Sequence, residues 1–558
     1  MSSGHAVEVP VLIVGAGPSG LCASILLSFH GIESLLVEKH PGTSIYPRAT
    51  GINVRSMEIF RSLGFRDDIQ RASFKAEPRI AFSRVLIDRE LNVSPSFRED
   101  HLDASPEEWT SCSQKELEPI LLRVASSHRQ AQVLFGTELL GFEESSEGIT
   151  AEIGDRATGH VRYVRSRYMV AADGSKSPIR RRLGLRMLGP GVLNHNISIH
   201  FSAPLSQYLP QGPNFLHFVQ NEDVTGMFVA TDGGSSWAFA VPYDPEHGES
   251  SDPITRDRAV ELVRRGAGIP GLHVDVLGIV PWTMEADSAE RWRVGNVFLA
   301  GDAAHRMTPA GGLGMNTAIQ DVHNLCWKLA AVWQGWAGSG LLDTYEAERR
   351  PVAQQNLDRS VDLVTGRGGD RPALDFDIGF KYASSAVIPD ETDLPDRTNG
   401  AHAPFAPAGS RAPHLWLDRN RKFSTLDSFG PYFTLLTGLG GEHWRAAAGT
   451  VAHEMQVPML VGHPRADIRG HKSGDDTWTA AYGIGATGAA LIRPDGHVAW
   501  RRAAGVLTPA KELRDILDAI LSRRRYFFRD VRGVQGDLGN PPEPIFTGAH
   551  AVVPGLDA

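Results

Sequence analysis

Two segments of the sequence combine glycines with acidic residues in spacings that could hold a phosphorylated cofactor. The first follows the apolar residues 11–14, typical of a strand buried on both faces, and precedes a helix expected over 21–30. Its GxGxxG spacing permits a tight turn, close approach of the backbone to a pyrophosphate, and close packing of helix on strand. The candidate phosphate-binding residues of this loop are Gly15, Gly17, Pro18, Ser19 and Gly20.

An acidic residue follows this loop at the distance expected for a nucleotide-binding βαβ unit. A second strand is expected over 34–37, and Glu38 and Lys39 stand at its end, about 20 residues after the glycines. A carboxylate there can bind the hydroxyls of a ribose. Residues 483–488 also fit GxGxxG, but a strand is expected after them instead of before them. We therefore interpret that second copy as a chance loop.

The second segment lies almost three hundred residues further along the chain, at 297–316. Its apolar start, 297–300, predicts a short strand that ends at Gly301 and Asp302, and a helix is expected around 318–329, with Asn316 placed to cap it. Glycines before a helix expose backbone N–H groups and the positive end of the helix dipole, which favour an electron-rich group. The remaining candidates of this loop are Pro309, Ala310, Gly311, Gly312, Gly314 and Met315.

A third candidate follows a stretch of alternating strands expected over 149–172. There Asp173 and Gly174 begin a D-G-x-x-S-x-x-R spacing that ends at Arg180. The pattern is either a turn before a basic helix or a part of the cofactor site, and the local sequence leaves both interpretations open.

Upstream, Ser113 and Glu116 predict a capping box for a helix over 114–125. Ser113 is therefore interpreted as structural. Gln114, in the first turn, remains a candidate for binding.

The middle of the chain, 190–280, contains strand-like runs rich in aromatic residues. One face of such a sheet must pack, so most of these side chains are expected in the core. The sheet could instead wall a flat apolar pocket, and the sequence does not choose between the two. The candidate substrate residues are His217, Phe228, Trp237 and Phe239, together with Pro309, Ala310 and Gly311.

Composition excludes several classes of function. With 558 residues and a net charge of −9, the chain lacks the basic footprint of a nucleic-acid binder. No run approaches the ~20 apolar residues that span a bilayer, and no signal peptide is recognisable, so neither a membrane nor an export function is expected. Three cysteines fit a reducing cytoplasm, and Cys22 and Cys326 are expected to pack as inert thiols. No metal-binding motif is present.

Together these motifs resemble the FAD-dependent single-component aromatic hydroxylases, the superfamily of para-hydroxybenzoate hydroxylase and phenol hydroxylase. The resemblance is carried by the GxGxxG loop, by Asp173-Gly174 with Arg180, and by "GDAAHRMTPAGGLGMN", and it extends over 8–365. The segments "YPRATGINVRSMEIFRSLG" and "AERWRVGNVFLAGDAAH" look most like the branch that acts on aromatic polyketides.

The family's fold implies an α/β protein in which an antiparallel substrate sheet interrupts a Rossmann-type FAD domain of the GR2-like kind. A thioredoxin-like domain would follow it, without redox cysteines because no cysteine lies beyond Cys326. The expected boundaries are 1–180 and 283–395 for the two parts of the FAD domain, 181–282 for the substrate sheet, 396–523 for the thioredoxin-like domain, and 524–558 for an extended tail.

The resemblance also implies a role for each matching residue. Gly15, Gly17, Ser19 and Gly20 would hold the FAD pyrophosphate, and Glu38 the adenosine ribose. Arg48, in "YPRAT", would reach the pyrophosphate, and with Pro309 it is a candidate for positioning the flavin. Gln114 and Asp302 would bind the ribityl chain, and the backbone of Gly314, Met315 and Asn316 would face the flavin ring. Asp173 would serve both FAD and the nicotinamide donor, while Gly301, Gly312 and the Gly174 turn complete the site.

The implied reaction is hydroxylation of an electron-rich aromatic substrate by NAD(P)H and O₂ through a flavin C4a-hydroperoxide. Baeyer–Villiger or ring-opening oxygenation on the same fold, hydroxylation of a simple phenol, and a flavin-binding protein without turnover are the alternatives. An NAD dehydrogenase is disfavoured because it would not need the Gly301-Asp302 loop. The oligomeric state stays open between monomer and homodimer.

Overall fold

A mixed sheet forms the centre of the first domain. The computed structural model describes residues 7–75, 77–88, 92–93, 103–209, 212–245, 254–367, 371–389, 405–464, 476–523 and 546–552. The strands of the central path, in spatial order, are β16 (Arg293–Val294), β17 (Val297–Leu299), β10 (Val161–Ala171), β1 (Val7–Val14), β2 (Ser34–Glu38) and β7 (Ala131–Phe135). The hairpin of β8 (Thr137–Ser145) and β9 (Gly148–Asp155) pairs with β10. Four of these strands are parallel to β1 or to its neighbours, as a dinucleotide-binding sheet requires.

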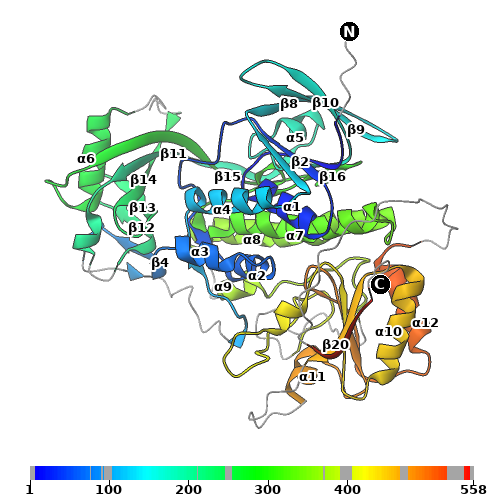
Figure 1. The fold of residues 1–558 in the computed structure, drawn as a ribbon. Coiled ribbons are helices and arrows are strands. Elements are labelled where there is room, and N and C mark those ends of the chain that lie inside the picture. Colours follow the sequence, from blue (N-terminus) through cyan, green and yellow to red (C-terminus); the bar gives the residue numbers. More distant parts are fainter. Residues whose placement is uncertain are drawn as a thin grey trace.

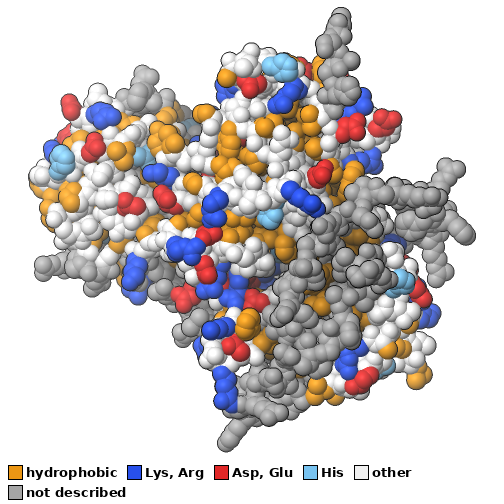
Figure 2. All heavy atoms as spheres, viewed as in Figure 1, with side chains coloured by type: hydrophobic (Ala, Val, Ile, Leu, Met, Phe, Trp, Pro, Cys, Tyr) orange, Lys and Arg blue, Asp and Glu red, His pale blue; other side chains and the backbone are white. Residues whose placement is uncertain are grey.

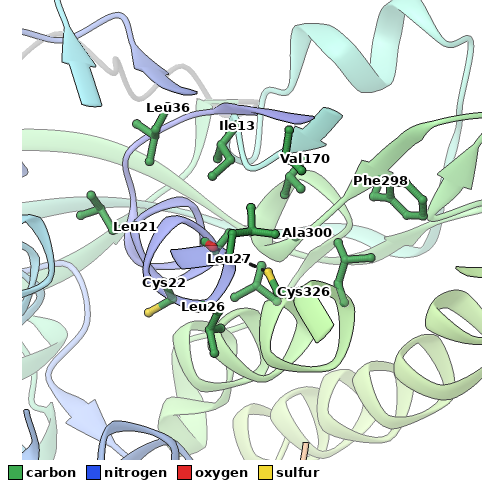
Figure 3. Packing of buried hydrophobic residues seen from close by; sticks show 14 of the residues in the cluster. Ile13, Leu21, Cys22, Leu26, Leu27, Leu36, Val170, Phe298, Ala300 and Cys326 are labelled. Atoms are coloured by element: carbon green, nitrogen blue, oxygen red, sulfur yellow. Dashed lines mark hydrogen bonds between the residues drawn. The ribbon is translucent and has the colours of Figure 1, made fainter. Parts of the chain in front are cut away.

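Helices far apart in the sequence pack together against this sheet. Figure 1 shows α1 (Pro18–Phe29), α4 (Gln114–Ser127), α7 (Leu313–Trp333) and α8 (Thr344–Val364) gathered at the centre of the molecule. The Cys326 thiol donates to the carbonyl oxygen of Ala23 at 3.7 Å, so α7 lies directly on α1 (Figure 3). Cys22 and Cys326 are buried in this core, as predicted, and burial raises the pKa of both thiols.

The middle of the chain forms a second large sheet with a helix on one face. Its strands, in spatial order, are β18 (His305–Arg306), β15 (Asp275–Ala289), β11 (Met187–Ser202), β14 (Ser236–Tyr243), β13 (Thr225–Ala230), β12 (Asn214–Gln220), β4 (Glu77–Ser83) and β5 (Asn92–Val93). The long strand β11 reaches from the central domain into this lobe, where α6 (Arg256–Ala267) covers one face (Figure 1). Strands β4 and β5 come from the segment 1–180, which we assigned to the FAD domain. They join the middle sheet because β4 pairs in parallel with β12, and a contact between such distant segments leaves no local signal in the sequence.

The C-terminal part folds around a five-stranded sheet. The order is β22 (Val498–Arg502), β21 (Ala489–Ile492), β19 (Phe433–Thr437), β20 (Met459–Pro464) and β23 (Phe546–Val552). With α10 (Glu442–Met455) between the parallel β19 and β20, and α12 (Pro509–Ile520) after the β21–β22 hairpin, the arrangement is that of a thioredoxin-like domain. Strand β23 belongs to the expected tail and adds to the sheet edge, while residues 524–545 and 553–558 lie outside the described residues.

Shorter elements complete the fold. They are α2 (Val54–Ser62), α3 (Arg66–Ala72), α5 (Pro178–Arg182), α9 (Ala373–Asp377), α11 (Asp476–Tyr482), and the pair β3 (Gly51–Ile52) and β6 (Thr110–Ser111). Residues 483–488 follow α11 and lead into β21, which confirms that the second GxGxxG is a loop.

Two cap predictions were wrong. Ser113 stands at the N-cap of α4, but its side chain makes no capping hydrogen bond, and Glu116 donates its N–H to the carbonyl of Ser113 instead. Helix α7 begins at Leu313, not after Asn316, because Gly312 takes the N-cap with a φ of +63°.

Two observations concern the surface. In Figure 2, acidic and basic side chains are interspersed over the face shown, in keeping with the net charge of −9. None of the described helices is both long and apolar enough to cross a membrane.

Candidate cofactor and substrate site

The glycine loop after β1 is closed on one side and open on the other. A Cβ on Gly15 would lie 2.2 Å from the carbonyl oxygen of Ala172, and one on Gly20 would lie 1.8 Å from the carbonyl oxygen of Gly15. Both glycines are therefore required for the chain to pack on itself. Gly17, the N-cap of α1, would meet no heavy atom within 4 Å, and no side chain of the described residues caps the helix. The free N–H groups at this N-terminus suit a pyrophosphate.

Glu38 reaches back to the same loop. Its Oε2 accepts the N–H of Ala16 at 2.8 Å, and its Oε1 accepts the N–H of His40 at the same distance. The carboxylate thus lies beside the glycine loop, and its contact with a ribose stays a prediction. The side chain of neighbouring Lys39 is exposed.

The Gly301-Asp302 loop touches the glycine loop directly. Gly301 has a φ of +60°, and a Cβ there would lie 2.8 Å from Ser19 Oγ and 3.1 Å from the Cβ of Ala318. The long separation in sequence therefore disappears in the fold. The side chain of Asp302 is exposed. Desolvation of its carboxyl by the surrounding protein raises its pKa, whereas the electrostatic effects of His305 and the nearby arginines act in the opposite direction.

Arg180 connects the third motif to this loop. Its guanidinium donates to the carbonyl oxygen of Ala303 at 2.8 Å and to that of Ser175 at 2.7 Å. Asp173 accepts the hydroxyl of Ser177 at 2.6 Å, and burial raises the pKa of Asp173. The D-G-x-x-S-x-x-R motif is both a turn before α5 and a neighbour of the Asp302 loop, so neither interpretation excludes the other.

Asn316 joins the start of α7 to the N-terminal segment instead of capping the helix. Its Oδ1 accepts the N–H of Asn53 at 2.9 Å, and its Nδ2 donates to the carbonyls of Gly51 at 3.0 Å and Gly312 at 2.7 Å. Gly314 is open, because among the described residues the nearest atom that a Cβ would meet is the Cβ of Met307 at 4.0 Å. Gly314 is half-buried, and its contact with the edge of a planar ring stays a prediction.

Arg48 and Gln114 lie on a loop and a helix that hold each other. Glu118 accepts Gln114 Nε2 and the N–H of Ser44, both at 2.6 Å, and burial raises the pKa of this carboxyl. The N–H of Gln114 donates to the carbonyl of Ala49 at 2.6 Å. Arg48 itself is exposed, and its side chain has no hydrogen bond or ion pair with any residue that the structure describes.

The four aromatic and histidine candidates of the middle sheet point away from this site. Phe228 and Phe239 stack at 4.0 Å between ring centroids, and a Cβ on Gly266 of α6 would lie within 3.0 Å of both rings. Trp237 belongs to the same core, and His217 is buried on the same face beside Ser83, 2.7 Å from its hydroxyl. Because side chains alternate along a strand, these residues face α6, and their assignment to a substrate pocket was wrong.

The opposite face carries side chains that were not among the predicted site residues. It is half-buried and apolar over β12 and β13, with Phe218, Met227 and Val229 beside Trp109. On β11 it is polar, because Asn196, Ser198 and His200 alternate with the core residues Ile197, Ile199 and Phe201. The ring of Tyr46, two residues before Arg48, contacts that of His200 in a tilted arrangement, with the ring centroids 4.9 Å apart and the planes at 32°. The signal was present in the sequence as N-x-S-x-H, in which polar residues alternate with Ile197 and Ile199.

A buried ion network leads from the Asp302 loop to the C-terminal domain. His305 Nε2 lies 2.8 Å from Asp321 Oδ2, and Asp321 Oδ1 accepts Arg349 Nε at 2.9 Å, with all three side chains fully buried. Burial alone would raise the pKa of Asp321, but His305 and Arg349 hold this pKa below its usual range. His305 is therefore held in the core by Asp321.

The preceding residue on α8, Glu348, belongs to a second buried charge cluster that crosses the domain boundary. Glu348 accepts two hydrogen bonds from Arg493, at 2.6 and 2.8 Å, and one from Lys328 at 2.7 Å. Arg493 also pairs with Asp495 in the turn between β21 and β22. The C-terminal domain is thus attached by buried charge to the helices beneath the cofactor motifs.

These features define a dinucleotide-binding domain whose glycine loop, Glu38 and distant Gly-Asp loop meet in one place. Two family models match the chain: an FAD binding domain over residues 8–360 and an aromatic-ring hydroxylase C-terminal domain over 406–523. The chain belongs to the FAD-dependent aromatic-ring hydroxylases and is a flavoprotein monooxygenase.

Among its relatives are polyketide hydroxylases. The chain is 38% identical to a putative polyketide hydroxylase of Streptomyces halstedii, over 92% of this chain and 97% of the relative. It is also 38% identical to the aklavinone 12-hydroxylase RdmE of Streptomyces purpurascens, over 92% and 99%. A crystal structure of aklavinone-11 hydroxylase with FAD and aklavinone superposes with a TM-score of 0.85 at 35% identity, over 93% of this chain and all of that one.

Proposed function

We propose that this protein uses NAD(P)H and O₂ to hydroxylate an aromatic ring of a polycyclic polyketide. The observation that carries the proposal is the half-buried face of the middle sheet, where Phe218, Met227 and Val229 offer a flat apolar surface opposite α6. The substrates named for the relatives support the same chemical class. When bound, FAD supplies the acceptor for the hydride of NAD(P)H and the group that activates O₂.

The chain's own residues would bind and orient both partners. Backbone N–H groups at the start of α1, beside Gly17, hold the pyrophosphate, and Asp302 binds the ribityl hydroxyls. The N-terminus of α7, open at Gly314, would hold the flavin by its ring edge, and its positive dipole end would stabilise negative charge there. Asp173 lies next to the Asp302 loop, where it contacts both FAD and the nicotinamide donor.

Arg48 and Pro309 would position the cofactor and the substrate, and they would take no part in making or breaking covalent bonds. Arg48 is the exposed cation of the loop that carries Tyr46, and Glu118 holds this loop through the N–H of Ser44. We assign to Arg48 the orientation of the cofactor and to Pro309, with Ala310 and Gly311, the contact between cofactor and substrate. The three free, buried cysteines and the need for NAD(P)H favour the cytoplasm as the place of reaction.

Consumption of NAD(P)H tests this proposal. The FAD-loaded enzyme is mixed with NADPH or NADH, and each is followed with aklavinone as a tetracyclic probe and with phenol as a single-ring probe. The tetracycle is expected to accelerate NAD(P)H consumption more than phenol does and to gain the mass of one oxygen atom. Acceleration by phenol alone would contradict the polycyclic substrate, and a ring-opened or ester product would replace hydroxylation by a Baeyer–Villiger outcome.

A further inference from the structure

The polar stripe on β11, defined as Asn196, Ser198 and His200, contains two buried polar atoms without partners. Asn196 is 5% exposed and His200 is 9% exposed. Neither Asn196 Nδ2 nor His200 Nδ1 has a hydrogen-bond partner among the described residues. A buried polar atom without a partner costs free energy comparable to that of a lost hydrogen bond, so two on one face of one strand indicate groups that bind something else.

The third member of the stripe is already satisfied. Ser198 Oγ accepts the indole N–H of Trp282 at 2.9 Å. Trp282 lies directly across from Asn196 in the register of β11 and β15, so its side chain belongs to the same face. The unsatisfied atoms are therefore confined to the two ends of the stripe, with a satisfied residue between them.

The far end of the stripe lies beneath the loop that carries Arg48. His200 is opposite Gly278 on β15, and a Cβ on Gly278 would lie 3.0 Å from Tyr46 Cε1. The absence of a side chain at Gly278 thus lets the Tyr46 ring lie over His200. Burial lowers the pKa of His200, so its imidazole is neutral at physiological pH and can accept a proton in a hydrogen bond.

We propose that Asn196 and His200 determine substrate specificity by binding two oxygen groups at opposite ends of a fused-ring substrate. Asn196 Nδ2 donates to a carbonyl oxygen, and His200 Nδ1 accepts from a phenolic hydroxyl. The two residues are four positions apart on an extended strand, a Cα separation of about 13 Å at ~3.3 Å per residue. One benzene ring with its hydroxyls cannot span this distance, whereas a tetracycle can. The inference rests on the proposed function and deepens it.

Binding measurements on four proteins test the stripe. The proteins are the wild type, Asn196→Leu, His200→Phe, which keeps a ring beside Tyr46, and the matched control Ser198→Ala. Aklavinone is titrated into each protein, with and without FAD, and binding is followed by quenching of tryptophan fluorescence. Circular dichroism and the unfolding midpoint establish that each variant folds.

We expect aklavinone to bind roughly tenfold more weakly to Asn196→Leu and to His200→Phe, because each leaves one substrate group unpaired. Ser198→Ala should bind aklavinone with the wild-type affinity. The affinity for phenol should fall in at most one of the variants Asn196→Leu and His200→Phe. Affinities for aklavinone equal to the wild type in both end variants, or no binding to any of the proteins, would overturn the inference. Because the readout needs neither FAD nor turnover, this failure is distinct from failure of the proposed hydroxylation.

Discussion

Replacement of Arg493 by Met is expected to destabilise the protein strongly, because it leaves two buried carboxylates without their principal partner. The Arg493 and Glu348 side chains are fully buried, and Arg493 is joined to Glu348 by two hydrogen bonds of 2.6 and 2.8 Å. Arg493 and Lys328 hold the pKa of Glu348 well below its usual range despite burial. Methionine fills a similar volume but provides no charge.

The magnitude follows from the cost of an uncompensated buried charge. Removal of one partner from a buried ion pair costs about 3–5 kcal/mol. Lys328 Nζ at 2.7 Å and Ser384 Oγ at 2.6 Å remain bonded to Glu348 and keep the loss toward the lower figure. Asp495 also loses its arginine but keeps the hydrogen bond from Asn324 Nδ2 at 3.3 Å. Against a typical unfolding free energy of about 5–15 kcal/mol, a loss of ~3 kcal/mol is easily measured.

Denaturant unfolding of the FAD-loaded Arg493→Met variant measures this loss, and fluorescence of released flavin reports whether the cofactor site fails with it. The matched control is Lys511→Met, which removes an exposed pair with Asp515 at 3.1 Å in the same domain and should cost less than about 1 kcal/mol. If Arg493→Met loses no more than the control, the buried network does not stabilise the domain contact, and our reasoning about it is refuted.

Three further predictions concern the cofactor loops and the sheet. Gly301→Ala should weaken FAD retention roughly tenfold in equilibrium dialysis, because the φ of +60° and the 2.8 Å distance from a Cβ to Ser19 Oγ both oppose a side chain. The control Gly335→Ala shares a positive φ of +82° but has open space around its Cβ, and it should bind FAD normally. Asn316→Leu should lower the unfolding free energy of the apoprotein by about 3 kcal/mol, since three buried hydrogen bonds are lost, and an unchanged value would discredit its joining role. Phe239→Ala should cost about 3–5 kcal/mol in denaturant unfolding yet leave the affinity of the folded protein for aklavinone unchanged, and a selective loss of affinity would return Phe239 to the substrate site.

Local patterns in the sequence predicted the elements that depend on neighbours along the chain. The apolar run before Gly15 became β1, and the strand before Gly301 became β17, because a buried parallel strand needs only a short continuous apolar stretch. The resemblance then predicted that their loops meet, and the contact between Gly301 and Ser19 shows where they do.

The errors concern features that depend on the partner across space. Phe228, Trp237 and Phe239 are large and apolar, but which face of their sheet receives α6 is not encoded in any one strand. A shift of one residue along a strand moves a side chain to the opposite face of the sheet. The predicted substrate residues therefore lie on the core face. Likewise Asn316 was expected to cap α7, and its bonds to Gly51 and Asn53 come from a segment that is distant in sequence.

Isotope labelling tests whether the enzyme transfers oxygen from O₂ to an aromatic ring. The FAD-loaded enzyme is incubated with NADPH, aklavinone and heavy-isotope-labelled O₂ in ordinary water, and the product is analysed by mass spectrometry. We predict a hydroxylated tetracycle that carries one labelled oxygen atom, formed only when FAD is bound. NADPH consumption that yields no labelled product, or a product whose new oxygen comes from water, would contradict the assignment as an aromatic hydroxylase.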